Sequence, residues 1–67
     1  MNKLKHYRQQ AGITQAELAE RAGVGVRMVQ HYEQGSKSLE KTAATTVLHL
    51  ARALGVTVED LIGQDNA

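Results

Sequence analysis

Residues 23–35, GVGVRMVQHYEQG, place several side chains with hydrogen-bonding chemistry on one side of a short helix. At about 100° per residue, that side carries Val26, Arg27, Gln30 and His31. The opposite side carries Met28, Val29 and Tyr32, which are expected in a buried face. These side chains are a guanidinium, an amide, an imidazole and a small apolar group, and none of them is Lys or Glu. This combination favours specific recognition over an ordinary solvated surface.

The polar residues elsewhere in the chain do not assemble into a catalytic or metal-binding pattern. His6, His31 and His49 lie far apart, and no two of them are three or four residues apart as helical metal ligands would be. No nucleophile–histidine arrangement, glycine-rich phosphate loop or carboxylate pair is recognisable, since the adjacent Glu59 and Asp60 fit a helix cap better. We therefore expect no metal, no cofactor and no enzyme activity.

The composition limits the chain to a single small domain with an uneven charge. The 67 residues include no cysteine, which fits a reducing cytoplasm, and no apolar run long enough for a membrane span. Residues 1–37 hold six basic and three acidic residues, a net charge of +3, whereas residues 38–67 hold two basic and four acidic, a net charge of −2. The N-terminal half is thus the side expected to meet a polyanion.

The pattern of capping residues and glycines predicts an all-α fold of about five short helices. The first covers about 2–10, with Leu4, Tyr7 and Ala11 on its apolar stripe, and ends at Gly12. A capping box formed by Thr14 and Glu17 opens the second, which stops at Gly23. Its inward-facing residues are expected to be Leu18, Ala19 and Ala22.

The later helices are predicted by the same signals. The third covers about 26–34 and closes at Gly35, and a polar loop follows at 36–38. The fourth is the longest, with Ser38 or Thr42 as its N-cap and an end near Leu54. Its apolar stripe is expected to contain Val47, Leu48, Ala51 and Leu54. Thr57 and Asp60 resemble another capping box, which opens a last helix containing Leu61 and Ile62.

A helix, a tight glycine-containing turn and a second helix with a polar outer face describe a helix-turn-helix. At this point the sequence resembles the Cro/C1-type (XRE-like) regulators of prophages and mobile elements, over about residues 3–63. The residues that carry the resemblance are Leu4, Arg8, ITQAELA at 13–19, AGV at 22–24, Val29, YE at 32–33, Gly35, LARALGV at 50–56 and EDLI at 59–62. The chain departs from the usual pattern with Gly25 in place of Ser or Thr, and with a longer, proline-free connection after Gly35.

The resemblance implies that the third helix lies in the major groove of DNA. The base-contacting residues would be Val26, Arg27, Gln30 and His31, because guanine, adenine and the thymine methyl offer them matching groups. Contacts to phosphate would come from Gln15, Gly25 and Lys37. Arg8 would pair with Glu33 and tie the first helix to the third. For Arg27 a phosphate contact or a plain surface position is the alternative. For Val26, Gln30 and Gln15 the alternative is a plain solvated surface, and for Arg8 it is a contact to DNA.

These implications lead to a sequence-specific, double-stranded DNA-binding transcriptional regulator, with a repressor as the expected form. It would bind a pseudo-palindromic operator as a homodimer, through a surface containing Val58, Leu61 and Ile62, unless these residues only close the monomer core. A cytoplasmic location is expected, and residues 64–67 are expected to be a frayed tail. The alternative function is a protein-interaction module, such as an antitoxin-like or adaptor domain, on the same helical scaffold.

Overall fold

Six helical segments make up the computed structural model, which describes residues 2–63. They are α1 (Leu4–Ala11), α2 (Gln15–Ala22), α3 (Val26–Gln34), the short 3-10 helix η1 (Leu39–Lys41), α4 (Ala44–Leu54) and α5 (Val58–Ile62). No strand occurs between residues 2 and 63, and no helix in that range is long and apolar enough to cross a membrane. The all-α prediction is confirmed, and the expected tail 64–67 lies outside the described residues.

Local signals fix where most of the helices begin and end. At the start of α2, the Glu17 N–H donates to Thr14 Oγ1 at 3.0 Å and the Thr14 N–H donates to Glu17 Oε1 at 2.8 Å. The same reciprocal pair, between Thr57 and Asp60, opens α5. Gly23 ends α2 at φ 71°, a left-handed conformation that side chains disfavour, and its N–H bonds the last turn. Both predicted capping boxes are confirmed.

The start of α4 differs from the prediction. Ala43 is the N-cap residue, and it makes no side-chain cap. The Thr42 hydroxyl instead donates to the Ser38 carbonyl at 2.9 Å and shares a 3.2 Å hydrogen bond with the Tyr32 hydroxyl. Ser38 precedes η1, again without a side-chain cap. Neither predicted N-cap is correct, because the connection folds into an extra turn that buries Leu39, and Thr42 serves to hold that turn against α3.

The buried face of α4 agrees with the predicted stripe at Val47, Ala51 and the partly buried Leu54, but it contains Leu50 in place of Leu48. Val47, Leu50 and Ala51 are buried, whereas Leu48 is 38% exposed. The true stripe follows the spacing i, i+3, i+4, and Leu48 lies about 100° away from Val47 around the helix. On α1 the prediction also fails at Ala11, which is exposed, although Leu4 is fully buried.

Leu61 is the anchor of the short helix α5. It is fully buried and belongs to the core, while Val58 and Ile62 are partly buried against it. Leu61 therefore closes the monomer core and is not available to the proposed dimer surface. The remaining core residues come from every helix and from the first interhelical loop: Leu4, Ile13, Leu18, Ala19, Ala22, Val29, Tyr32, Leu39, Val47, Leu50 and Ala51.

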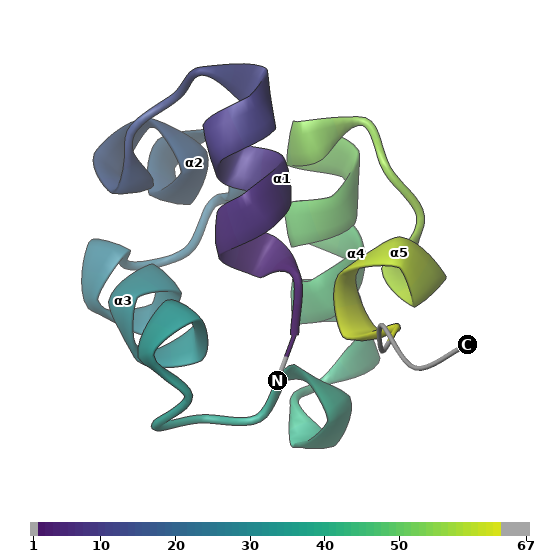
Figure 1. Cartoon of the computed structure of the whole chain (residues 1–67). Coiled ribbons are helices and arrows are strands. Elements are labelled where there is room, and N and C mark those ends of the chain that lie inside the picture. Colours follow the sequence, from purple (N-terminus) through teal and green to yellow (C-terminus); the bar gives the residue numbers. More distant parts are fainter. Residues whose placement is uncertain (1, 64–67) are drawn as a thin grey trace.

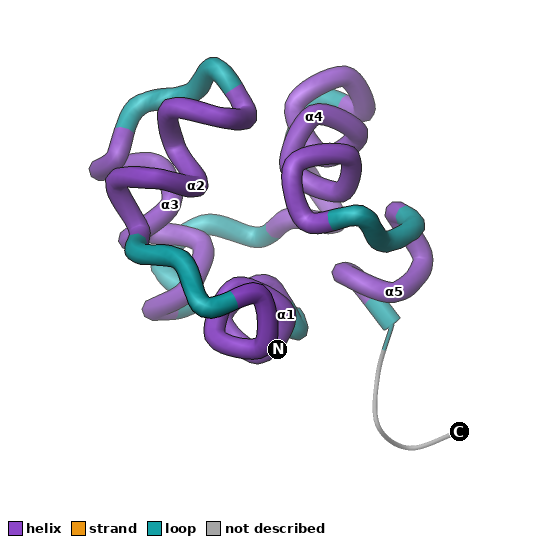
Figure 2. The backbone as a smooth tube through the Cα atoms, turned by 90° about the horizontal axis from the view of Figure 1, so that it is seen from above, coloured by secondary structure: helices purple, strands orange, loops and turns teal. Residues whose placement is uncertain are grey.

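Helices α2 and α3 lie beside α4 and α5, with α2 packed directly against α4 and α1 lying across the front of both groups (Figure 1 and Figure 2). In Figure 1, α2 and α3 lie on one side and α4 and α5 on the other, and the view from above in Figure 2 shows the same division. The segment before α1 joins the two sides, since the Lys3 N–H donates to the Leu61 carbonyl at 2.8 Å and Asn2 Nδ2 donates to the Tyr32 carbonyl at 3.1 Å. The first of these hydrogen bonds attaches the segment to α5 and the second attaches it to the last turns of α3.

Candidate nucleic-acid interface

The turn between α2 and α3 is only three residues long and is held by backbone hydrogen bonds. The Val24 N–H donates to the Ala19 carbonyl at 3.0 Å, which directs the chain away from α2. Gly25 is the N-cap of α3 in an extended conformation, and its carbonyl accepts from the Met28 N–H at 3.0 Å. Since Gly25 has no side chain, the first turn of α3 is uncovered.

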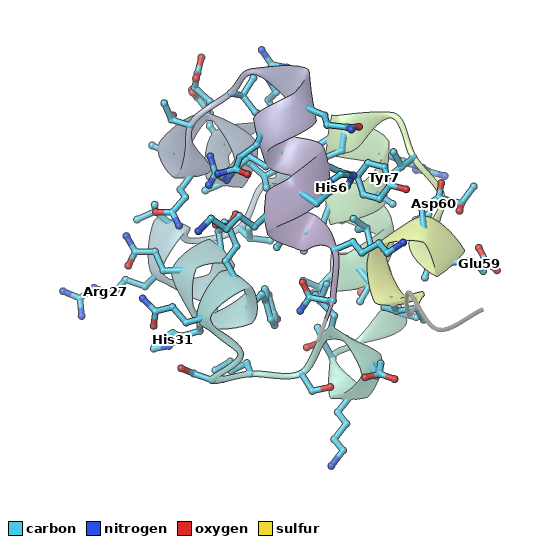
Figure 3. All side chains as sticks on the ribbon, viewed as in Figure 1. His6, Tyr7, Arg27, His31, Glu59 and Asp60 are labelled. Atoms are coloured by element: carbon cyan, nitrogen blue, oxygen red, sulfur yellow. The ribbon has the colours of Figure 1, made fainter. Side chains whose placement is uncertain are left out.

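Helix α3 divides into a buried side and a polar outer side, as the sequence predicts. Val29 and Tyr32 are buried, and Met28 is partly buried against the core. Val26, at 39% exposed, Arg27 and His31 are exposed, and Gln30 is half-buried. Figure 3 shows the Arg27 and His31 side chains projecting from the same side of the molecule.

The polar groups on the outer side of α3 are free for an external partner. Among residues 2–63, no side-chain hydrogen bond or ion pair is found for Arg27, Gln30 or His31. The helix also carries no exposed carboxylate, since its single acidic residue, Glu33, has a side chain only 3% exposed. This surface is therefore basic and rich in donors, with nothing to repel a polyanion.

The three residues predicted to contact phosphate lie around this surface, at the ends of α2 and α3. Gln15 is the first residue of α2 and is half-buried, with Nε2 donating to Glu33 Oε1 at 3.0 Å. Gly25 precedes α3, and its exposed backbone starts the helix. Lys37 is exposed just beyond the end of α3, and its N–H donates to the His31 carbonyl at 3.3 Å.

Arg8 and Glu33 form a charged pair where α1, α2 and α3 meet. Arg8 Nε donates to Glu33 Oε2 at 2.6 Å and the Arg8 amino group donates to Glu33 Oε1 at 3.1 Å. The other amino group of Arg8 donates to the Ile13 carbonyl at 2.9 Å, just before α2. The hydrogen bond with Glu33 raises the pKa of Arg8. With its side chain only 13% exposed, Arg8 is turned inward rather than toward a ligand.

Two contacts beside this interface had no signal in the sequence. They are the Gln15–Glu33 hydrogen bond and the Asn2–Tyr32 hydrogen bond, whose partners are 18 and 30 residues apart. Periodicity and capping patterns report on neighbours within about one turn of a helix, so they are silent about such pairs. The tertiary fold alone brings these side chains together.

Two acidic residues of helix α5 lie on another side of the molecule (Figure 3). Glu59 and Asp60, both on α5, are labelled in Figure 3 on the side opposite Arg27 and His31. Asp60 is engaged in its capping box. Within residues 2–63, no three His, Asp or Glu side chains cluster in a way that would hold a metal ion.

Two helices joined by a three-residue turn, the second with an uncovered polar face, define a helix-turn-helix protein. A family model described as a helix-turn-helix domain matches residues 2–62, so the chain belongs to this family. A search of curated proteins and a search of solved structures gave no match. Family membership confirms the helix-turn-helix prediction and indicates DNA binding.

Proposed function

We propose that this protein is a sequence-specific regulator of transcription of the Cro/C1 (XRE-like) type, from a prophage or mobile element. In this proposal it acts in the cytoplasm as a repressor and binds a pseudo-palindromic double-stranded operator as a homodimer. The observation that carries the proposal is the outer side of α3, where Arg27, Gln30 and His31 are free of internal partners and no exposed carboxylate is present.

In the proposed complex, α3 enters the major groove and its first two turns meet the base edges. The groove admits one helix and displays a distinct pattern of donors, acceptors and methyl groups for each base pair. Arg27 would bind guanine O6 and N7 with both arms of its guanidinium, and Gln30 would bind adenine N6 and N7. Val26 would contact a thymine methyl, and His31 would donate or accept one hydrogen bond.

The flanking residues would bind the phosphates on either side of the groove. Gln15 and Gly25 precede or begin the two helices of the motif, where backbone N–H groups have no intrahelical partner. Lys37 follows α3 and would supply a point charge. Contacts of this kind fix the register of the protein on the duplex, whereas the α3 side chains supply the specificity.

The test is binding to a random-sequence duplex at low salt, followed by selection of preferred sites from a random library. We expect retardation of the random duplex and enrichment of one sequence with two-fold symmetry. If the protein does not bind any duplex at micromolar concentration, the proposal is wrong and a protein-interaction module on the same scaffold takes its place.

The salt dependence of binding tests the phosphate contacts separately. The slope of log K against log salt changes by about 0.9 for each phosphate neutralised, so Lys37→Ala should give a shallower slope and weaken all duplexes alike. Arg52→Ala is the matched control, because it removes one exposed positive charge from α4, outside the proposed interface. Equal slopes for Lys37→Ala and the unaltered protein would exclude a phosphate contact at Lys37.

A further inference from the structure

The Glu33 carboxylate joins the two helices of the DNA-binding motif by a side-chain hydrogen bond, in addition to their apolar packing. It accepts hydrogen bonds from three donors: Arg8 Nε at 2.6 Å, an Arg8 amino group at 3.1 Å, and Gln15 Nε2 at 3.0 Å. Glu33 belongs to α3, Arg8 to α1 and Gln15 to α2. Its side chain is only 3% exposed, so Glu33 does not itself face a ligand.

The two residues that donate to Glu33, Arg8 and Gln15, differ in the hydrogen-bonding groups that remain for a ligand. Each nitrogen of the Arg8 guanidinium already donates inside the protein, two to Glu33 and one to the Ile13 carbonyl. The Gln15 amide has two N–H groups and one carbonyl oxygen, and Glu33 uses one N–H. Gln15 as a residue is half-buried, so part of it reaches the surface, and its second N–H has no partner among residues 2–63.

The planar amide makes the direction of the second N–H depend on the first. Its two N–H bonds diverge by about 120° in one plane, so the N–H directed inward to Glu33 sets where the other one lies. Without that hydrogen bond, the glutamine side chain would sample several rotamers, and binding would have to restrict it at an entropic cost. Glu33 can therefore hold the Gln15 side chain in one orientation without contacting the ligand itself.

We propose that Glu33 is a positioning residue for DNA binding, whose buried carboxylate holds the Gln15 amide so that its second N–H is presented to a phosphate of the duplex. The proposal rests on the DNA-binding function proposed above. It assigns Glu33 two separable effects: a contribution to stability through Arg8, and a contribution to affinity through Gln15.

The test is a double-mutant cycle on affinity for a random duplex, measured well below the melting temperature of every variant. Gln15→Met removes both amide donors at similar size and should weaken binding about three- to tenfold, as expected for the loss of one solvent-accessible hydrogen bond. Glu33→Gln leaves one acceptor oxygen for which Arg8 and Gln15 must compete. In that background, Gln15→Met should weaken binding less than about twofold, since the two sites are coupled.

Lys37→Ala is the control for the cycle, because Lys37 has no hydrogen bond to Glu33. Its loss of affinity should be the same in both backgrounds. An equal effect of Gln15→Met in both backgrounds would overturn the positioning role, as would no effect of Gln15→Met on a protein that binds DNA. Absence of DNA binding by the unaltered protein would instead overturn the proposed function itself.

A measurement on the unaltered chain covers the case in which Glu33→Gln does not fold. The two Nε2 protons of Gln15 give separate NMR signals. In the free protein, the proton donated to Glu33 should exchange slowly, and the other should exchange fast. Added duplex should shift the second signal and leave the first protected. Loss of the first signal's protection on binding would show that Gln15 exchanges Glu33 for DNA, which contradicts positioning.

Discussion

At the scale of single residues, burial distinguishes Arg8, which bonds within the protein, from Arg27, which is exposed. Arg8 has a side chain only 13% exposed, and each of its three guanidinium nitrogens donates one hydrogen bond, to Glu33 or to the Ile13 carbonyl. Arg27, on α3, is exposed and has no hydrogen bond or ion pair within residues 2–63. A guanidinium that is left free on a helix of this shape is suited to bidentate recognition, which an ammonium group cannot provide.

Arg27 is the residue at which specificity should be most sensitive. Arg27→Ala should cost about 1–3 kcal/mol of binding free energy on the selected operator and much less on random duplex. Arg27→Lys should not restore the difference, because it retains the charge without the fork. Both variants are to be measured on both duplexes at one salt concentration. Parallel losses on the two duplexes, with rescue by lysine, would reassign Arg27 to a phosphate.

At the scale of elements, α2 depends on the capping box at its first turn. The pKa of Glu17 is lowered by two hydrogen bonds with Thr14. The one from the Thr14 N–H has the larger effect and the one with the Thr14 side chain the smaller. Because the pKa is lower in the folded state, the ionised carboxylate stabilises the fold above the unfolded-state pKa. This contribution is lost as the pH falls through the folded-state pKa.

The capping box therefore predicts an acid-sensitive part of the stability. The Glu17→Gln variant should lack the charge-dependent part of the stability already at neutral pH. The unaltered protein should lose the same part as the pH falls from about 5 through the ordinary glutamate pKa of about 4.3. The two curves of unfolding free energy against pH should converge in acid. Denaturant titrations at several pH values provide the measurement. Curves that run parallel down to pH 3 would show that Glu17 does not contribute through its charge.

The contact of α1 with α3 through Arg8 and Glu33 gives a second prediction at this scale. Glu33→Ala should lower the free energy of unfolding by about 1–3 kcal/mol, because it leaves a largely buried guanidinium without its partner. Glu40→Ala is the control, since Glu40 is exposed on η1, and a surface change of this kind costs within about 0.5 kcal/mol. Thermal melts of both variants provide the comparison. A melting temperature equal to that of the control would return Arg8 to the candidates for DNA contact.

At the scale of the whole molecule, the basic recognition surface and the acidic helix α5 lie on opposite sides. In the proposed complex, such a distribution would orient the basic surface toward the duplex and place α5 on the side away from it. On α5, Val58 and Ile62 are only partly buried, whereas Leu61 is committed to the core. Any dimer surface in this region therefore has to be built from Val58, Ile62 and the end of α4.

The dimer proposal predicts two protomers per selected operator, with half-sites about one helical turn apart. Sedimentation with and without the duplex measures this stoichiometry. Ile62→Glu should weaken the second binding event and leave the first intact, whereas Leu48→Glu, at an exposed apolar position of α4, should change neither. A strict one-to-one complex on the selected site would contradict the dimer.

The sequence by itself determined where most of the helices lie and the two faces of α3, but not η1 or the start of α4. Both depend on interactions within about one helical turn, such as the Thr14–Glu17 and Thr57–Asp60 boxes and the left-handed glycines. The tertiary structure alone decided the burial of Leu50 in place of Leu48, the use of Thr42 against Tyr32, and the attachment of Gln15 to Glu33. Those outcomes depend on which distant helix packs against each side chain, and local periodicity does not encode that choice. The DNA contacts of α3 stay predictions, since they require the partner.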